Sequence, residues 1–273
     1  TTTTHIMQNN IKKRKIIIIV FLFFILSPFS VKAQEHFRVM FYNTENFFDC
    51  THDSLKDDYE FLPNSMYHWT RSRVYQKAFH IAQVIAAVGE MTPPALIGLC
   101  EVEDDSSMYY LLRRSPLRQM DYRYVMTHSK DERGINVALL YQRGLFRLLQ
   151  KDSIRPQFPE KSYRPTRDIL HVAGMIMTGD TLDVFVCHPP SRMGGQKASE
   201  QARIYVASLL RNYVDSLMVR RKHPQIIIIG DFNDYPDCKS ISKILGAKEP
   251  PDSIVSNRLY DLMAGKFKDK SFG

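Results

Sequence analysis

The sequence predicts an α/β (α+β) domain in which helices cover β-sheets, and three observations lead to this class. Short apolar segments of strand type recur along the chain, amphipathic segments with helical spacing lie between them, and turn residues separate the two kinds. The chain has 273 residues, of which 44% are hydrophobic and 24% charged. That length allows one large domain or two small ones, and this composition excludes a disordered or collagen-like chain.

The strand predictions rest on β-branched and aromatic residues bounded by turn formers, and they cover residues 37–42, 95–100, 122–127, 135–141, 145–150, 169–177, 181–187 and 225–229. The segments before and after Gly179 are predicted to pair as a hairpin. A first helix is expected to begin after Thr70 and to stop at Gly89. A second, longer amphipathic helix is expected around residues 202–217, and its polar face accounts for its basic residues without any nucleic acid.

The net charge of +8 does not by itself indicate a polyanion-binding protein. Five of the 37 basic residues lie in the first 33 positions, which contain no Asp or Glu. The rest of the chain therefore carries 32 basic and 29 acidic residues, a net charge of +3. Such a balance permits a phosphate-bearing partner but does not require one, because strong polyanion binders usually concentrate their positive charge in a patch.

The first 33 residues have the pattern of upstream sequence and a secretory signal peptide. A basic run at 12–15 precedes an apolar run at 16–26, and Val31 and Ala33 occupy the −3 and −1 positions of a cleavage site before Gln34. The apolar run is shorter than the ~20 residues that span a bilayer, so a stable membrane anchor is the weaker interpretation. We therefore expect export to the periplasm or the extracellular space, with the domain occupying residues 34–273.

The four cysteines do not indicate a disulfide scaffold or a zinc site. They are Cys50, Cys100, Cys187 and Cys238, without the close pairs that zinc sites use. Cys100 and Cys187 each end an apolar run, so we expect buried free thiols rather than bridges. Export would nevertheless permit a disulfide.

Polar residues come directly after four of the predicted strands. Asn43 and Glu45 follow the first, Glu101 and Glu103 the second, His188 the third, and Asp231 and Asn233 the fourth. Rigid strand ends can hold several polar groups on one rim of an α/β fold. A converging site is therefore predicted.

The residue types of this set favour metal-assisted phosphoester hydrolysis. Carboxylates and carboxamides without thiolates suit Mg²⁺, Mn²⁺ or Ca²⁺ rather than zinc. Plainer alternatives remain open for each residue. Glu45 could be a solvent-facing loop acid, as Glu103 is expected to be; Asp231 and Asn233 could form a simple Asx turn, and His188 could only close its strand. Acidic residues at 53, 57, 58 and 60 fit a solvated loop better than a second cation site.

Four motifs in this order resemble those of the endonuclease/exonuclease/phosphatase superfamily, which includes pancreatic-type deoxyribonuclease, abasic-site endonucleases, sphingomyelinases and inositol-polyphosphate phosphatases. They are FYNTEN at 41–46, LCEVE at 99–103, FVCH at 185–188 and GDFN at 230–233. The resemblance covers about residues 37–261. It implies a four-layered α/β/β/α sandwich with two packed sheets flanked by helices.

The resemblance also implies roles for individual residues. Asn43, Glu45 and Glu101 would lie at the metal, with Glu101 as its principal ligand. Asp231 would activate or align the attacking water, and Asn233 would orient Asp231 or the phosphate. His188 would stabilise the charge that develops on the phosphate or the leaving group. Arg167 and Arg192 are candidate phosphate contacts that could equally be surface arginines.

The resemblance implies a nuclease-like phosphodiesterase with nucleic acid as the preferred substrate. A lipid or inositol phosphate phosphatase or phosphodiesterase, and a non-catalytic binding protein of the same fold, are the alternatives. The family ends with a Ser-Asp-His motif, yet no histidine follows His223. We therefore expect a chain that is incomplete at its C-terminus and lacks the last strands of the fold. The sequence does not indicate an oligomeric state.

Overall fold

The computed structural model describes residues 37–90, 92–159 and 163–268. They belong to one compact unit that begins at Phe37. The predicted signal peptide at 1–33 and its cleavage site lie outside the described residues. Within the described part of the chain, no helix combines the length and the apolar character that crossing a membrane requires.

The described chain contains two four-stranded sheets of mixed direction. In the first, the order is β1 (Val39–Phe47), β2 (Leu96–Val102), β4 (Asn136–Gln142) and β3 (Tyr122–Met126). In the second, it is β5 (Phe146–Ile154), β6 (Ile169–Ile176), β7 (Thr181–Cys187) and β8 (Gln225–Gly230). The β1·β2 and β7·β8 pairs are parallel and the other pairs are antiparallel. Each sheet therefore contributes one parallel pair.

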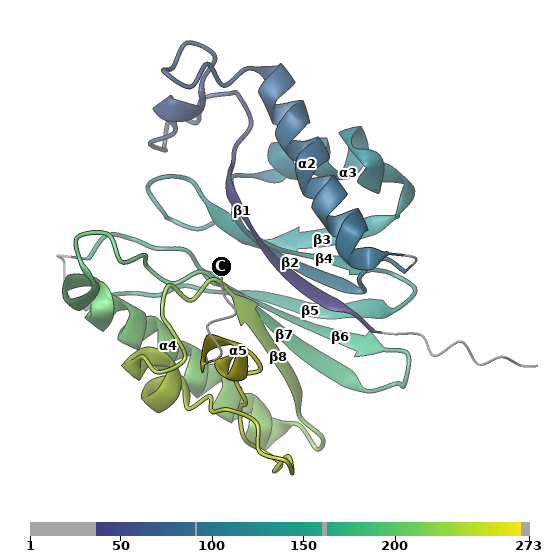
Figure 1. Cartoon of the computed structure of the whole chain (residues 1–273), viewed down its shortest axis with the longest axis vertical. Helices are drawn as coiled ribbons and strands as arrows, with labels where there is room; N and C mark the ends of the chain where they lie inside the picture. The colour runs from purple at the N-terminus through teal and green to yellow at the C-terminus, as the bar shows by residue number, and fades with distance from the viewer. Residues whose placement is uncertain (1–36, 91, 160–162, 269–273) are drawn as a thin grey trace, which may run out of the picture. The chain divides into compact units, whose positions relative to one another are not determined.

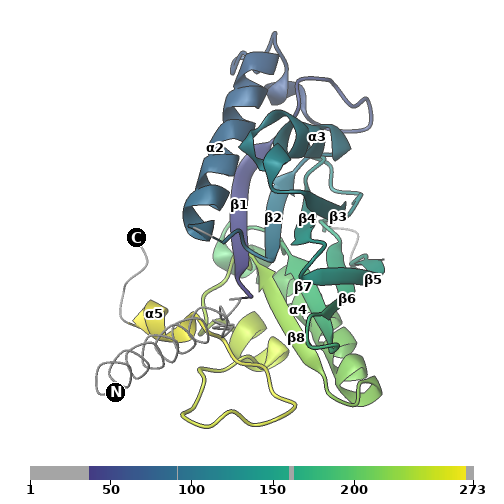
Figure 2. The ribbon, with the colours of Figure 1, turned by 90° about the vertical axis from the view of Figure 1, so that its right-hand side faces the viewer.

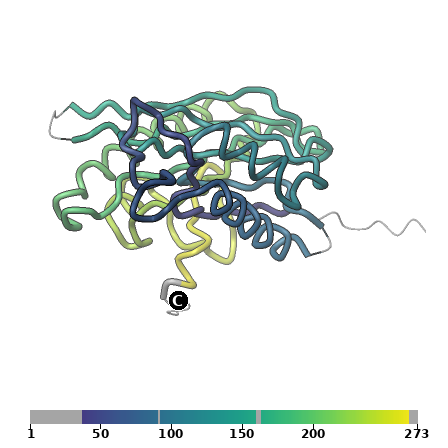
Figure 3. Tube along the Cα trace, turned by 90° about the horizontal axis from the view of Figure 1, so that it is seen from above, coloured from purple at the N-terminus to yellow at the C-terminus, as the bar shows by residue number. Residues whose placement is uncertain are grey.

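Helices cover the outer face of each sheet. Helices α2 (Arg71–Gly89) and α3 (Asp105–Arg114) lie over the first sheet, and α4 (Gln196–Arg220) lies over the second (Figures 1 and 2). Two short 3₁₀ turns, η1 (Tyr59–Phe61) and η2 (Pro116–Gln119), precede α2 and follow α3 in the chain. The chain after β8, drawn from green to yellow in Figure 3, continues through the π-helical turn η3 (Ser240–Leu245) to α5 (Ala264–Lys268).

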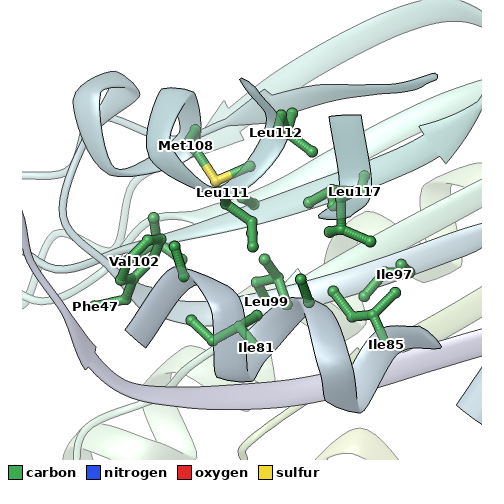
Figure 4. Close-up of a cluster of buried hydrophobic side chains, with 14 of the residues drawn as sticks. Phe47, Ile81, Ile85, Ile97, Leu99, Val102, Met108, Leu111, Leu112 and Leu117 are labelled. Atoms are coloured by element: carbon green, nitrogen blue, oxygen red, sulfur yellow. The ribbon is translucent and has the colours of Figure 1, made fainter. Parts of the chain in front are cut away.

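Three apolar cores separate these layers. The first lies between α2, α3 and the first sheet, where Figure 4 shows Ile81 and Ile85 of α2 beside Leu99 of β2. The second joins the two sheets and contains Cys100 of β2, and the third packs α4 on the second sheet. Because side chains alternate along a strand, Leu99 and Cys100 enter different cores. The predicted four-layered α/β/β/α sandwich is confirmed.

Two glycines permit close approach near the strand ends. A Cβ at Gly98 of β2 would lie 2.5 Å from Ile229 Cδ1 of β8, so the two sheets approach closely there. A Cβ at Gly230 would lie 2.1 Å from the Cys187 carbonyl oxygen of β7. These contacts bring the end of β8 against both β7 and the first sheet, which positions the residues that follow it.

The structure corrects the predicted strand ends in the first sheet. Residues 37–42 and 95–100 were expected as strands, whereas β1 continues to Phe47 and β2 to Val102. Asn43, Glu45 and Glu101 thus lie inside irregular strands rather than after them, because the ladder shifts register between Asn43 and Phe47 and between Cys100 and Val102.

The structure also adds helical elements and leaves the cysteines unpaired. Helix α3, which Asp104 caps by accepting a hydrogen bond from the Ser107 backbone at 2.9 Å, was not predicted from the sequence. Helix α4 begins at Gln196, ahead of the predicted start. All four cysteines are free, and Cys100 and Cys187 are buried as expected.

Candidate active site

The ends of β1, β2, β7 and β8 converge where the two sheets meet. The side-chain amide of Asn43 donates to Asp231 Oδ2 at 3.0 Å and lies 3.4 Å from Glu101 Oε1. This one side chain therefore links residues of both sheets. His188 Nε2 lies 3.8 Å from Glu101 Oε1, which is too long for a direct hydrogen bond. Asn43, Glu101, His188 and Asp231 form one cluster.

Glu101 is held by an irregular backbone. Its φ is +59°, and Glu45 and Asn46 on the neighbouring strand have φ values of +53° and +64°. The Thr44 hydroxyl donates to the carbonyls of Cys100 at 2.7 Å and Glu101 at 3.1 Å, which pins the two irregular segments together. The Asn46 backbone amide then donates to Glu101 Oε2 at 2.9 Å. The Glu101 carboxylate is thus aimed into the cluster.

The orientation of Asn43 is fixed by its neighbour. The Glu45 backbone amide donates to Asn43 Oδ1 at 2.8 Å, so the Asn43 NH₂ group must face the carboxylates. Asn43 therefore acts as a hydrogen-bond donor in this arrangement. The Glu45 side chain is exposed, and Lys77 of α2 donates to its carbonyl at 3.0 Å. Burial lowers the pKa of Lys77, and the charges of Glu45 and Glu101 act in the opposite direction.

His188 is buried and neutral. Burial lowers its pKa to about 2, and the positive charges of Arg167 and Arg133 act in the same direction. Its Nδ1 has no hydrogen-bond partner among the described residues, whereas Nε2 faces Glu101. We assign the imidazole proton to Nε2, because a proton on Nδ1 would be a buried donor without an acceptor.

The segment after β8 is an Asx turn whose second oxygen reaches the other sheet. The Asn233 backbone amide donates to Asp231 Oδ1 at 3.0 Å, while Asp231 Oδ2 receives Asn43. Asn233 has a φ of +53°, and its side chain donates to the Pro189 carbonyl at 3.2 Å. The turn therefore both orients Asp231 and attaches it to the loop that follows His188.

The two candidate phosphate-binding arginines are engaged by the protein. Arg167 donates to the carbonyls of His188 at 3.0 Å and Pro189 at 2.7 Å, and to Asp131 at 3.3 Å. Its side chain is only 10% exposed. Arg192 donates to the Asn233 carbonyl at 2.8 Å. These bonds favour a positioning role, in which both guanidinium groups brace the backbone that carries the site.

Sequence reasoning missed Arg133. Its guanidinium donates to the Asn46 side chain, and the residue is exposed. It lies in a polar turn before Gly134, whose φ is +86°. A turn of this composition looks like any solvated loop, and only the folded chain places it at the rim of the site.

A second acidic group lies beyond the ends of β1 and β2. One carboxylate oxygen from each of Asp49, Glu103 and Asp104 lies within 4.8 Å of the others. Among the described residues, this is the group of three acidic, His or Cys side chains that are close enough together to hold a metal ion. The group excludes the predicted ligands Glu45 and Glu101. The Asp49 backbone donates to Glu103 at 2.6 Å, and the three residues line a cavity of about 550 Å³.

Glu103 was expected to be a solvent-facing loop acid, and this prediction is wrong. Glu103 is 8% exposed, because β2 continues to Val102 and carries it into the cavity wall. Burial raises its pKa to about 8, and the neighbouring charges of Asp49 and Asp104 also act to raise it. Among the acidic residues between 53 and 60, Asp58 is buried and accepts from the Asp53 backbone at 2.7 Å, so it braces the loop.

The family model for the endonuclease/exonuclease/phosphatase family matches residues 38–272. The chain belongs to this family. Members of the endonuclease/exonuclease/phosphatase family are hydrolases that act on phosphoesters, generally with divalent metal ions. No curated protein sequence matches the chain.

Three solved structures resemble parts of the chain. A functionally unknown conserved protein from Enterococcus faecalis V583 shares 12% identity at a TM-score of 0.51, covering 77% of this chain and 71% of that one. TDP2 from Caenorhabditis elegans shares 16% identity at a TM-score of 0.48, covering 66% of this chain and 46% of that one. A family protein from Bacteroides thetaiotaomicron shares 18% identity at a TM-score of 0.48, covering 62% of this chain and 59% of that one. The matched regions thus span less than two thirds of the last two proteins.

Proposed function

We propose that the protein is an exported, divalent-metal-dependent phosphodiesterase with nucleic acid as its preferred class of substrate. The observation that carries this proposal is the Asn43 bridge between Glu101 of the first sheet and Asp231 of the second. It places two carboxylates and a neutral histidine around one point. A phosphoester hydrolase needs such an arrangement to hold a metal, a water and a phosphate together.

The donor set fits a hard divalent cation. Glu101 would hold it as principal ligand, with the exposed carboxylate of Glu45 and the side chain of Asn43 beside it; Mg²⁺, Mn²⁺ or Ca²⁺ suits such oxygens. The Glu101 carboxylate receives only N–H groups of Asn43 and Asn46, and no Lys or Arg in the described chain forms a salt bridge with it. When bound, the ion would polarise the phosphoryl oxygen and neutralise developing charge.

Asp231 is proposed as the group that takes the proton of the attacking water. Its two oxygens are oriented by Asn43 and by the Asn233 backbone amide. As the water oxygen bonds to phosphorus, its proton moves to Asp231, the ester P–O bond breaks, and the departing oxygen takes a proton from solvent. His188, which stays neutral, would donate its Nε2–H to the phosphate as charge develops.

The test is hydrolysis by the purified full-length gene product. We expect turnover of bis(p-nitrophenyl) phosphate and of single- or double-stranded DNA with Mg²⁺ or Mn²⁺, and none with chelator. Asp231→Asn should lower kcat by about 10²- to 10⁴-fold because an amide cannot accept the proton. Asp215→Asn, an exposed position on α4, is the matched control.

The substrate panel separates the alternatives. Turnover of inositol phosphates or phospholipid headgroups without turnover of DNA would replace nucleic acid as the substrate class. If no phosphoester were hydrolysed with any divalent ion, the protein would be a binding protein that retains the fold.

Export is tested separately. Mass spectrometry of the protein recovered from the periplasm or medium should give an N-terminus at Gln34. Recovery of a cytoplasmic protein with residues 12–26 intact would contradict export.

A further inference from the structure

Asp234 is a buried carboxylate that the proposed reaction does not use. It follows Asn233 directly, and its side chain is 2% exposed. The carboxylate accepts a hydrogen bond from the Ser240 hydroxyl at 2.5 Å and from Arg192 Nη2 at 3.2 Å. Arg203 Nε lies 2.8 Å away as an ion pair without hydrogen-bond geometry. The Asp234 carboxylate thus contacts three side chains, those of Arg192, Arg203 and Ser240.

These partners come from three separate segments. Arg192 lies in the loop after β7, Arg203 on α4, and Ser240 at the start of η3. Arg203 is 1% exposed and also donates to Ser199 Oγ at 2.7 Å, so it is locked to its own helix. Asp234 therefore fastens the turn after β8 to a rigid helix.

The same network reaches the site residues. Arg192 uses Nε to donate to the Asn233 carbonyl at 2.8 Å while Nη2 contacts Asp234. Asn233 has a left-handed backbone with φ of +53°, a conformation that Asn adopts more readily than other non-glycine residues, and the Arg192 contact holds its carbonyl in place. Its backbone amide in turn orients Asp231 at 3.0 Å. Through Arg192 and Asn233, the path from Asp234 to the proposed base is three contacts long.

The far end of α4 carries an ion pair of the same chemistry. Arg221, just after α4, donates Nε and Nη2 to Asp183 at 2.9 Å each, and Asp183 is fully buried. Asp183 lies five residues before His188 on β7, about 16 Å along an extended strand at ~3.3 Å per residue. This pair anchors the helix without touching the site, so it shows what a purely structural pair does.

We propose that Asp234 is a positioning residue that holds Asp231 and Asn233 in register with His188 through Arg192 and Arg203. The proposal rests on the proposed function for its activity readout only. Whether the Asp234 carboxylate fixes the turn at 231–234 can be measured without any substrate.

The experiment compares Asp234→Asn with Asp183→Asn in the full-length gene product. Each change removes the negative charge of a buried ion pair and keeps the side-chain volume. Both variants should unfold at lower temperature than the parent. With bis(p-nitrophenyl) phosphate and Mn²⁺, well below both Tm values, Asp234→Asn should lower kcat by about ten- to a hundredfold with KM nearly unchanged, and Asp183→Asn should leave kcat within about twofold. Equal kcat values for the two variants would overturn the proposal.

Hydrogen exchange supplies the second readout. The peptide containing the Asn233 amide should exchange faster in Asp234→Asn and at the parent rate in Asp183→Asn. If the parent hydrolyses no phosphoester, the proposed function fails and this comparison still decides the positioning role. If Asp234→Asn does not fold, Ser240→Ala removes only the hydroxyl and should show a smaller change in the same direction. Unchanged exchange and kcat in that variant would then count against the proposal.

Discussion

Two acidic groups, one around Glu101 and one around Glu103, lie at the ends of the same two strands, β1 and β2, yet their surroundings differ. Glu101 receives hydrogen bonds from Asn43 and Asn46, whereas Glu103, two residues further, shares its cavity with Asp49 and Asp104. In the second group, burial raises the pKa values of Glu103 and Asp49. Without a bound cation, burial and mutual repulsion therefore favour the protonated forms of the second group.

Exchanging the two glutamates for glutamine gives the largest expected effect. Glu101→Gln should lower Mn²⁺ affinity at least tenfold and phosphodiester hydrolysis about 10²-fold or more, because it removes the principal proposed ligand charge. Glu103→Gln should leave both within about twofold, since a buried acid with a pKa of about 8 is largely protonated at pH 7. Calorimetric titration with Mn²⁺ measures the first quantity. Loss of affinity in Glu103→Gln alone would move the metal to the second group.

The pH dependence of the free energy of unfolding should distinguish Glu103 of the second acidic group from the residues of the candidate site. The folded-state pKa of Glu103 is raised to about 8 from an ordinary 4.5, so its stabilising contribution is complete below 4.5 and is lost as pH rises through 8. His188, with its lowered pKa, destabilises the fold only as pH falls below 6.5. Between pH 6.5 and 8, the change in stability therefore reports on Glu103 and not on His188.

In that window the parent should lose stability relative to Glu103→Gln, with a slope of at most about 1.4 kcal/mol per pH unit. Urea unfolding at pH 6.5, 7.2 and 8 measures it, and Asp215→Asn, at an exposed position on α4, is the control. A difference in stability that does not vary with pH would show that Glu103 is ionised throughout.

The smallest expected effect concerns the cations beside each group. Arg133 lies at the rim of the site, while Lys56 donates to the Ser129 and Asp131 carbonyls beside the second cavity. Arg133→Ala should raise KM for an anionic diester a few fold, with an effect that shrinks at high salt, because an exposed cation attracts its ligand through a screened field. Lys56→Ala should leave KM unchanged. Steady-state kinetics at 0.05 and 0.5 M NaCl would reveal the difference, and equal KM values for the two variants would remove Arg133 from the site.

The fold was predictable because strand patterns are local. Every strand segment predicted from the sequence overlaps one of β1 to β8, since β-branched runs bounded by turns need little help from distant residues. Helix α3 was missed because only one turn of it enters the core, through Met108, Leu111 and Leu112, and its signal is a single capping aspartate.

The convergence of motif residues was predictable from the sequence, but their individual contacts were not. Motif residues at strand ends were brought together, as for Asn43 and Asp231, which are 188 positions apart. The pairing of Arg167 with Asp131 and the burial of Glu103 against Asp49 depend on loops whose paths carry no sequence pattern. The proposed roles of the site residues remain predictions.

The left-handed backbones of Glu45, Asn46, Glu101 and Asn233 have a consequence for protein engineering. For the two glutamates such a backbone costs roughly 1–2 kcal/mol compared with a relaxed conformation, whereas Asn adopts it more readily. A search for heat-resistant variants would therefore favour glycine at the two glutamate positions, where it relieves the backbone and deletes the side chain. Thermostability gained by that route would come at the expense of activity, so a stability screen should be paired with a measurement of turnover.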